Sequence, residues 1–168
     1  AIDFLMASLD WTPKDLDRIV VAEGPGSYTG LRIAVATAKT LAHTLNIELV
    51  GISSLLALLP NQQEGLVVPL MDARRNNVYV GFYEHAQPIF PEAHLSFAEV
   101  LEQVKDADQV TFVGEVGAFV EQIQEQLPQA NYQETLPNAA NLALRAWDKE
   151  ADSLHDFVPN YLKRVEAE

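Results

Sequence analysis

The segment between residues 19 and 52 constrains the fold most, because a strand, a glycine-rich loop, a long helix and a second strand follow one another there. Residues 19–22 are all apolar, as in a strand that is covered on both faces. The loop at 24–30 holds three glycines and a proline, which favour neither strand nor helix. Residues 31–45 repeat apolar side chains at helical spacing, and residues 47–52 resemble a strand again. This order predicts a β-α-β unit with parallel strands and a right-handed crossover, and therefore an α/β fold.

The helix at 31–45 has three different faces. One arc is apolar and rich in alanine, a second carries charged and histidine side chains, and a third is mildly apolar with several threonines. The sequence leaves open which arc packs on the sheet and which meets a partner. The apolar arc comprises Leu31, Ala34, Val35, Ala38, Leu41, Ala42 and Leu45, the second arc Arg32, Lys39 and His43, and the third Ile33, Thr37, Thr40 and Thr44.

The second half of the chain continues the alternation of strands and helices. Apolar runs at 66–71 and 78–83 flank a charged turn and predict a hairpin. Polar residues at 61–65 mark the boundary that we expect between a first lobe, 1–60, and a second lobe, 61–168. The other patterns predict helices at 54–59, 97–105, 116–127 and 138–149, a strand at 110–114 and an extended tail from 158.

Composition excludes several classes of function. Of the 168 residues, 24 are acidic and 11 are basic, and the net charge of −13 argues against unaided binding to nucleic acid. The chain has no cysteine, which excludes a disulfide scaffold, a zinc ribbon and a thiol nucleophile and suits the cytoplasm. No apolar run reaches the roughly 18 residues of a membrane span, so we expect no membrane partner. The four histidines lack the spacing of a helical metal-binding pair, so we expect no metal site.

The first residues predict an amphipathic helix that is apolar on more than one side. Ile2, Leu5, Met6 and Leu9 follow the i, i+3, i+4, i+7 pattern, and Phe4 lies opposite them. Such a helix is either enclosed in the core or part of an interface, and the sequence does not decide between the two. No capping residue precedes it, so we expect that the chain starts inside a helix and that an upstream segment is missing.

The glycine-rich loop suggests phosphate binding, because a loop that opens onto a helix N-terminus offers free N–H groups. Its spacing, G-x-G-x-x-x-G, matches neither the dinucleotide fingerprint nor a P-loop. The alternative, which we favour, is a tight turn that packs the helix on the sheet. Ser27 lacks the G-x-S-x-G context of a nucleophile, so no catalytic residue is expected. The motif comprises Gly24, Pro25, Gly26, Ser27, Tyr28, Thr29 and Gly30.

A charged turn at 72–76 joins the two strands of the predicted hairpin. In one interpretation it is a solvated turn in which the Asp72 carboxylate pairs with a nearby arginine. In the other, Arg74 and Arg75 contact a phosphate or a partner, because a guanidinium group binds anions through paired hydrogen bonds. Both interpretations stay open at this point.

Three blocks of sequence, in order, resemble the TsaB (YeaZ) family. The run GPGSYTGLRI at 24–33, followed by ATAK at 36–39, is similar to the family's glycine-rich signature. Residues 72–79 resemble a second block, and residues 159–164 with the last two residues resemble the closing segment. The resemblance spans residues 1–168.

The resemblance implies an actin-like ATPase fold (ASKHA, ribonuclease H-like) of two lobes. Family members begin with a strand hairpin that carries a phosphate-binding turn, so we expect a first lobe truncated at its N-terminus. TsaB-like proteins are non-catalytic scaffold or activator partners of a paralogous TsaD-like (Kae1/Gcp) subunit. That subunit forms N6-threonylcarbamoyladenosine in tRNAs reading codons that begin with A. A TsaE-like ATPase joins them, contact with tRNA is indirect, and without its partner a TsaB-like protein forms a homodimer.

The resemblance also implies a partner interface on the first two helices. TsaD-like proteins carry an H-x-x-x-H metal pair, and this sequence has none, which agrees with a non-catalytic subunit without a cofactor. The alternative is an enzyme that binds a nucleotide by itself, an ATPase or a glycoprotease-like peptidase, supported by the glycine loop and the ATPase relatives of the fold. By matching position, the expected interface comprises Ile2, Leu5, Met6 and Leu9 on the first helix and Arg32, Ala36, Lys39, Leu41 and His43 on the second.

Overall fold

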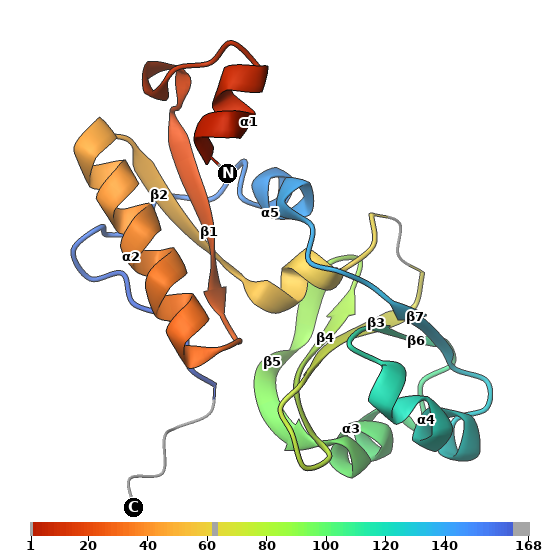
Figure 1. The fold of residues 1–168 in the computed structure, drawn as a ribbon. Coiled ribbons are helices and arrows are strands. Elements are labelled where there is room, and N and C mark those ends of the chain that lie inside the picture. Colours follow the sequence, from red (N-terminus) through yellow and green to blue (C-terminus); the bar gives the residue numbers. More distant parts are fainter. Residues whose placement is uncertain (1, 62–63, 163–168) are drawn as a thin grey trace, which may run out of the picture.

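The computed structural model describes residues 2–61 and 64–162, which form two sheets joined by a short helical turn (Figure 1). Strands β1 (Arg18–Gly24) and β2 (Glu48–Ser53) pair in parallel, and helix α2 (Tyr28–Leu45) connects them. This confirms the predicted β-α-β unit. We refer to these elements, with the segments packed on the two strands, as the first unit.

Helix α2 begins at Tyr28, earlier than the apolar pattern predicts, because Ser27 caps it. The Ser27 Oγ accepts a hydrogen bond from the N–H of Gly30 at 3.4 Å. The helix ends before Asn46, whose left-handed backbone (φ 54°) closes its last turn.

The structure shows which arc of α2 meets the sheet. Residues of the predicted apolar arc are buried against β1 and β2, together with Val21, Leu49 and Phe157. The charged arc and the threonine arc lie outside this contact, and Leu41 and Leu45 of the apolar arc are only half-buried, so these residues remain accessible to a partner. The buried residues of α2 are Leu31, Val35, Ala38 and Ala42.

The opposite face of the two-stranded sheet is covered by residues from far along the sequence. Helix α5 (Ala139–Arg145) places Leu142 against Val50 and Ile52 of β2. Side chains of β1 alternate between this cluster and the one under α2, so both faces are covered, as predicted. Most of β1 is nevertheless only half-buried, because within the described part of the chain it pairs with β2 alone.

The second unit is a five-stranded sheet with the strand order β5-β4-β3-β6-β7. Strands β3, β6 and β7 run parallel, whereas β4 is antiparallel to both of its neighbours. This confirms the predicted hairpin and the strand predicted at 110–114. The strands are β3 (Leu66–Asp72), β4 (Asn77–Glu84), β5 (Gln87–Ser96), β6 (Val110–Gly114) and β7 (Asn131–Glu134).

The sequence does not predict β5 and β7. Strand β5 contains Pro88 and Pro91, which have no N–H for a ladder hydrogen bond. Strand β7 is short and polar, and its four residues are all exposed. Both are edge strands, where neither burial nor alternation is required.

Helices α3 (Phe97–Val104) and α4 (Val120–Gln126) lie on one face of this sheet (Figure 1). The predicted helix at 116–127 is divided, because a 3-10 turn, η3 (Gly117–Phe119), precedes α4. The predicted α3 is confirmed, with its four apolar residues all buried in the core of the second unit.

The other face of the five-stranded sheet meets the first unit through η2 (Ser54–Leu58), a 3-10 helix at the place of the short helix predicted at 54–59. Leu55 and Leu58 of this turn pack in one cluster with Val67. The connection between the two sheets is therefore itself part of a buried core.

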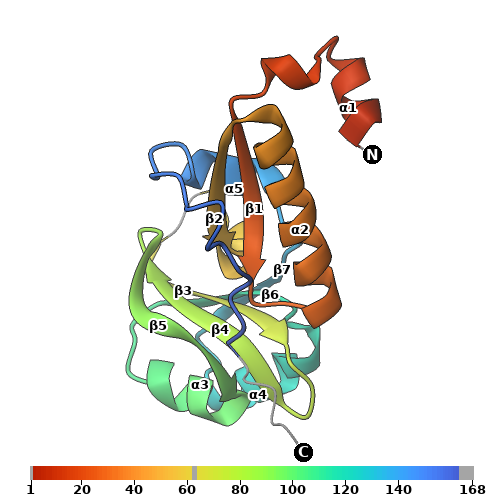
Figure 2. The ribbon, with the colours of Figure 1, turned by 90° about the vertical axis from the view of Figure 1, so that its left-hand side faces the viewer.

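Helix α1 (Ile2–Ser8) projects beyond the first sheet, and a 3-10 turn, η1 (Pro13–Asp15), leads from it to β1. Figure 2 shows α1 and α2 along the same side of the molecule. The helix predicted at 138–149 ends at Arg145, where α5 gives way to turns.

A capping box at the start of α3 makes stability depend on pH. The Glu99 carboxylate accepts hydrogen bonds from the Ser96 hydroxyl at 2.6 Å and from its N–H at 2.9 Å, and both lower the pKa of Glu99. A carboxylate whose pKa is lowered by folding adds stability above the titration range of the unfolded chain, near about pH 4. That stability is lost as the pH falls through the lowered pKa.

We predict that Glu99→Gln lowers the free energy of unfolding near neutral pH and that the deficit shrinks in acid, below about pH 4. Urea unfolding of both proteins across this range measures the difference. Glu125→Gln, at an exposed position of α4, is the matched control and is expected to show no such profile. Equal profiles for Glu99→Gln and the unchanged protein would contradict a role for the capping carboxylate.

Candidate functional site

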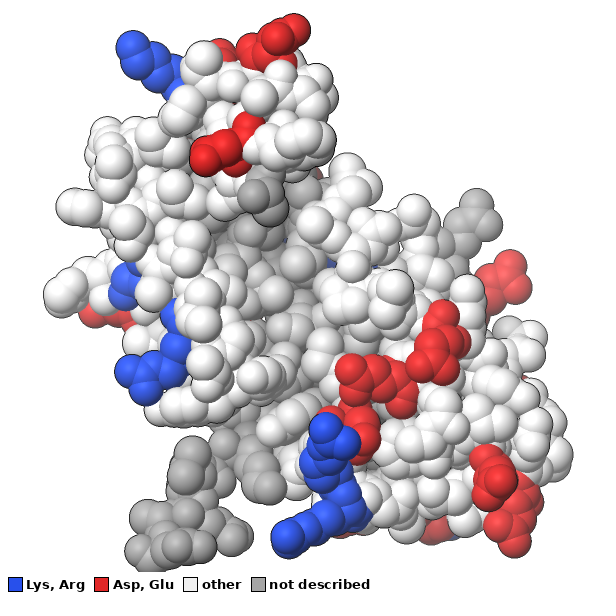
Figure 3. Space-filling view, in the orientation of Figure 1, with Lys and Arg blue, Asp and Glu red and all other residues white. Residues whose placement is uncertain are grey.

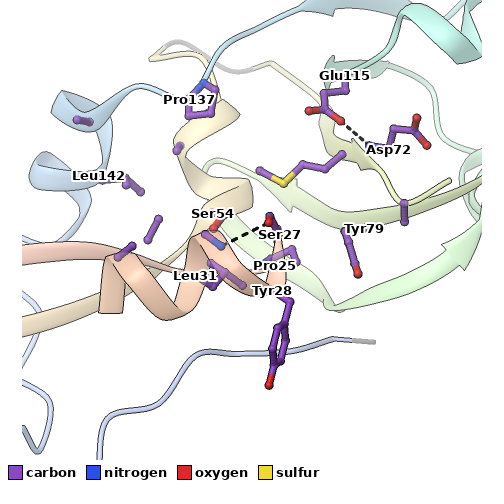
Figure 4. A pocket seen from close by; sticks show the side chains of 18 of the residues that line it. Pro25, Ser27, Tyr28, Leu31, Ser54, Asp72, Tyr79, Glu115, Pro137 and Leu142 are labelled. Atoms are coloured by element: carbon purple, nitrogen blue, oxygen red, sulfur yellow. Dashed lines mark hydrogen bonds between the residues drawn. The ribbon is translucent and has the colours of Figure 1, made fainter. Parts of the chain in front are cut away.

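A cleft of about 770 Å3 lies between the two units, where the glycine-rich loop faces the turn at 72–76 (Figure 4). The space-filling view shows the hollow between the units (Figure 3). The structure thus brings together two motifs that are far apart in the sequence. Pro25, Gly26, Ser27, Tyr28 and Gly30 of the first motif and Asp72 and Arg74 of the second line the cleft, while Gly24, Thr29 and Arg75 are not part of its lining.

The glycine loop is shaped by contact with the end of the chain. Gly24 has a φ of +131°, and a Cβ built on it would lie 2.2 Å from the carbonyl oxygen of Asn160. The Asn160 N–H donates to the Glu23 carbonyl at 2.8 Å. A side chain at Gly24 would therefore be strained and would displace the closing segment. This contact supports the interpretation of the loop as a tight turn.

Aromatic stacking joins the first and third sequence blocks. The rings of Tyr28 and Tyr161 stack with their centroids 5.1 Å apart. Arg32 lies over Tyr28, with its guanidinium carbon 5.3 Å from the ring centroid, and donates to the Tyr28 hydroxyl at 2.9 Å. The part of the third block beyond Leu162 lies outside the described residues.

The turn at 72–76 is held by backbone contacts. The Asp72 carboxylate accepts from the N–H of Arg74 at 2.8 Å, and the Asp72 N–H donates to Glu115 Oε2 at 2.7 Å (Figure 4). Asp72 thus contacts the backbone of Arg74, and within the described residues it forms no ion pair with a guanidinium. Three consecutive residues adopt left-handed backbone conformations, Arg74, Arg75 and Asn76, with φ of 70°, 54° and 58°.

The cleft has walls of mixed charge. The N-terminal N–H groups of α2 and the Arg74 side chain favour anionic groups, whereas the carboxylates of Asp72 and Glu115 oppose them. No histidine lines the cleft, and the Ser27 hydroxyl bonds to a backbone N–H. Among the residues that the structure describes, no group of three metal-ligating side chains is brought together. The arrangement can hold a polar ligand, but it places no nucleophile beside a base.

The expected interface residues lie on the outside of the first unit. In α1, Ile2, Leu5 and Leu9 are exposed and Met6 is half-buried, so this helix is not enclosed in the core. In α2, the side chains of Arg32, Ala36 and His43 are exposed, and those of Lys39 and Leu41 are half-buried. Lys39 also has a contact within the chain, because its Nζ donates to the carbonyls of Phe157 at 2.8 Å and His155 at 3.1 Å.

Two residues of the site region are missed by the sequence reasoning. Glu115 directly follows β6, and β6 is the parallel neighbour of β3, which ends at Asp72. Because the carboxyl ends of neighbouring parallel strands meet at one edge, the position of Glu115 was accessible from the strand pattern. No pattern in the sequence predicts the position of Tyr161, because its ring stacks on Tyr28 from a distant segment that belongs to no helix or strand.

Comparisons with known proteins agree with the resemblance. A family model described as "TsaD: tRNA N6-adenosine threonylcarbamoyltransferase" matches residues 1–168. The tRNA threonylcarbamoyladenosine biosynthesis protein TsaB of Bacillus subtilis (strain 168) is 38% identical over 180 residues, covering 100% of this chain and 79% of that protein. The chain belongs to the TsaB (YeaZ) family.

Other members of this family are similar over shorter stretches or in structure. The TsaB protein of Escherichia coli (strain K12) is 31% identical over 74 residues, 42% of this chain and 32% of that protein. The structure of YeaZ from Pseudomonas aeruginosa is 27% identical, with a TM-score of 0.75 over 96% of this chain and 80% of that chain. A crystal structure from that organism, of a protein with similarity to peptidase YEAZ, gives a TM-score of 0.77 at 27% identity, covering 96% of this chain and 81% of that chain.

The α/β fold is therefore that of YeaZ, as the sequence predicts at this level of detail. None of the helices in the described ranges has the length and apolar character that a membrane crossing requires.

The contact between Gly24 and Asn160 predicts different tolerance at two neighbouring glycines. Gly24→Ala is expected to lower the free energy of unfolding by about 2 kcal/mol or more, because of the positive φ and the overlap with Asn160. Gly26→Ala is the matched control, because a Cβ there would meet only Leu31, at 3.6 Å or more. Urea unfolding measures both variants, and equal stability of the two would contradict the assigned role of Gly24.

Proposed function

We propose that this chain is a non-catalytic scaffold or activator subunit that pairs with a TsaD-like subunit. In this role it supports formation of N6-threonylcarbamoyladenosine in tRNAs that read codons beginning with A. The match along the whole chain to a TsaB protein, named for threonylcarbamoyladenosine biosynthesis, supports the proposal. A TsaE-like ATPase joins the complex, and without its partners the chain forms a homodimer.

The observation that carries the proposal is an apolar surface on α1 that no described residue covers. Ile2, Phe4 and Leu5 remain 51%, 81% and 60% exposed, and α1 has no buried residue. Ile33 of α2 is 63% exposed, and α1 and α2 lie along the same side of the molecule (Figure 2). Full burial of such a side chain contributes about 1.5–3 kcal/mol, so a partner that covers this surface gains substantial free energy.

We further propose that the two units are the lobes of an actin-like fold, the first formed by residues 1–60 and the second starting at residue 61. The cleft between the units and the similarity to YeaZ support this arrangement. Helix α5 and the segment after it then return to pack on the first lobe.

Two features support a role without chemistry of its own. Among the residues that the structure describes, the cleft brings together no histidine and no nucleophile beside a base. The chain carries a net charge of −13, and acidic side chains gather over the second unit on the face in Figure 3. Such a surface repels the tRNA backbone, so in this proposal the partner binds the tRNA.

Light scattering on size-exclusion fractions tests the proposal, with the protein alone and mixed with its TsaD-like subunit. We expect a homodimer that gives way to a one-to-one complex. The scaffold role would be contradicted if the protein did not bind the TsaD-like subunit. It would also be contradicted if the protein alone formed N6-threonylcarbamoyladenosine from threonylcarbamoyl-AMP and tRNA.

Leu5→Glu is predicted to weaken the complex by about 30- to 1,000-fold, because it places an unpaired charge in a desolvated interface. Its melting temperature is expected to stay unchanged in a monomeric sample, since Leu5 is exposed. Ile89→Glu, at an exposed apolar position of β5, is the control and should bind normally. Ala38 is unsuitable for this test, because it faces the sheet. Normal binding by Leu5→Glu would place the interface elsewhere.

A second candidate function is nucleotide binding in the cleft, favoured by the N-terminus of α2 and Arg74 lining the same cavity. In that case ATP raises the melting temperature, and Gly26→Val or Ser27→Ala removes the increase. Absence of any shift with millimolar ATP and magnesium would reject this candidate and leave the scaffold proposal intact.

A further inference from the structure

The first two helices carry charges of opposite sign. Helix α2 contains no acidic residue, although 24 of the 168 residues of the chain are acidic, and its charged arc consists of basic side chains and a histidine. Residues 2–11, which form α1 and the turn after it, contain no basic residue and include Asp3 and Asp10. Two helices on the same side of the molecule (Figure 2) therefore differ in the sign of their charge.

These charges are not neutralised within the described part of the chain. Asp3 and Asp10 are exposed, and neither carboxylate forms an ion pair there. The Arg32 guanidinium contacts the ring and the hydroxyl of Tyr28 but no carboxylate. His43 is exposed at the other end of the charged arc. Both sets of side chains are therefore available to a second molecule.

Each helix also presents apolar surface beside its charges. On α1, Ile2, Phe4 and Leu5 are exposed next to Asp3. On α2, the threonine arc adjoins the charged arc and includes the exposed Ile33. Covering such apolar surface favours association, while the charges beside it determine which surfaces can meet.

The net charge restricts how two copies of this chain can associate. Copies that each carry a charge of −13 repel each other, so a contact between them needs local attraction. Contact of α1 with α1, or of α2 with α2, would place like charges together, which is unfavourable. Contact of α1 with α2 of the other copy brings opposite charges together, and a twofold axis repeats this contact. The charge pattern therefore favours a crossed arrangement.

We propose that two copies of this chain pair by crossed contacts, in which α1 of each copy lies on the outer face of α2 of the other. Asp3 and Asp10 then face the charged arc, and the apolar surface of α1 covers Ile33 and the threonine arc. This inference rests on the homodimer of the proposed function and adds which helices meet and what selects them.

Reciprocal charge reversal tests the crossed arrangement. One variant carries Asp3→Lys with Asp10→Lys, and the other carries Arg32→Glu with His43→Glu. Lys39 is kept, because its ammonium group also holds two carbonyls of the same chain. Each variant alone is expected to dimerise at least about 100-fold more weakly, because like charges then face each other.

An equimolar mixture of the two variants is expected to regain the dimer, with one copy of each. In that mixed dimer both crossed contacts again join opposite charges, which no other pairing of the two helices would achieve. Analytical ultracentrifugation measures the dissociation constants, and native mass spectrometry identifies the mixed dimer by its mass. Melting temperatures establish that each variant is folded.

Neutral variants give a second test, in which the two outcomes differ in sign. Asp3→Asn with Asp10→Asn keeps the size of both side chains and is expected to weaken the homodimer about fivefold or more, because it removes the attraction to α2. If these carboxylates faced solvent, the dimer would instead become tighter, because the lower net charge reduces the repulsion between copies. Asp108→Asn with Glu125→Gln, at exposed positions of the second unit, is the matched control and should not weaken the dimer.

Three results would overturn the proposal: a folded reversal variant that dimerises as tightly as the unchanged protein, a mixture of folded variants that stays monomeric, or a tighter dimer after Asp3→Asn with Asp10→Asn. The last comparison decides alone if a reversal variant does not fold. Binding of the unchanged protein to the TsaD-like subunit in the same experiments would leave the scaffold role intact. An unchanged protein that is monomeric by itself would remove the homodimer and this inference with it.

Discussion

Arg18 and Lys39, two cations of the first unit, donate hydrogen bonds to backbone carbonyls between residues 146 and 157. The packing of the first unit depends on these contacts. Charge-assisted hydrogen bonds of this kind are stronger than neutral ones. They keep Phe157 in the core beneath α2, where it contributes apolar surface that a two-stranded sheet lacks. Arg18 Nη1 donates to the carbonyls of Ala146, Trp147 and Lys149 at 2.6, 3.0 and 3.1 Å, and Lys39 holds those of His155 and Phe157.

The same returning segment sets the geometry of the cleft. It brings the Asn160 carbonyl against Gly24 and the Tyr161 ring against Tyr28. The glycine-rich loop is thereby fixed by contacts within the chain, so Gly24 has a structural explanation that needs no phosphate. The cleft lies between the first unit and the second sheet, next to the loop that this segment fixes.

Patterns in the sequence predict those elements whose burial alternates along the chain. The β-α-β unit, the β3–β4 hairpin and α3 follow from periodicity and capping residues, and the interior position of Leu142 follows from helical spacing. The edge strands escape prediction because one is interrupted by prolines and the other is wholly exposed. An alanine-rich arc suits both a sheet and a partner, so the orientation of α2 needed the structure.

The sites are harder to predict than the elements. The two main motifs are recognisable as local patterns, but their meeting across one cleft depends on how η2 joins the two sheets. Long-range contacts of this kind follow from the packing of whole elements, and they leave little trace in the residues on either side.

The returning segment also has a consequence for the order of events on the ribosome. Residues 18–53 emerge early and can form a strand–helix–strand element, but Phe157 and Ala146, which complete its two faces, are synthesised about a hundred residues later. Both apolar faces of the nascent strand–helix–strand element therefore stay incompletely covered during this time. The second sheet, which is contained within residues 66–134, can assemble in the meantime. Exposed apolar surface of this kind is what chaperones bind. During synthesis, the second sheet is therefore expected to fold first, and the first unit to complete its packing last.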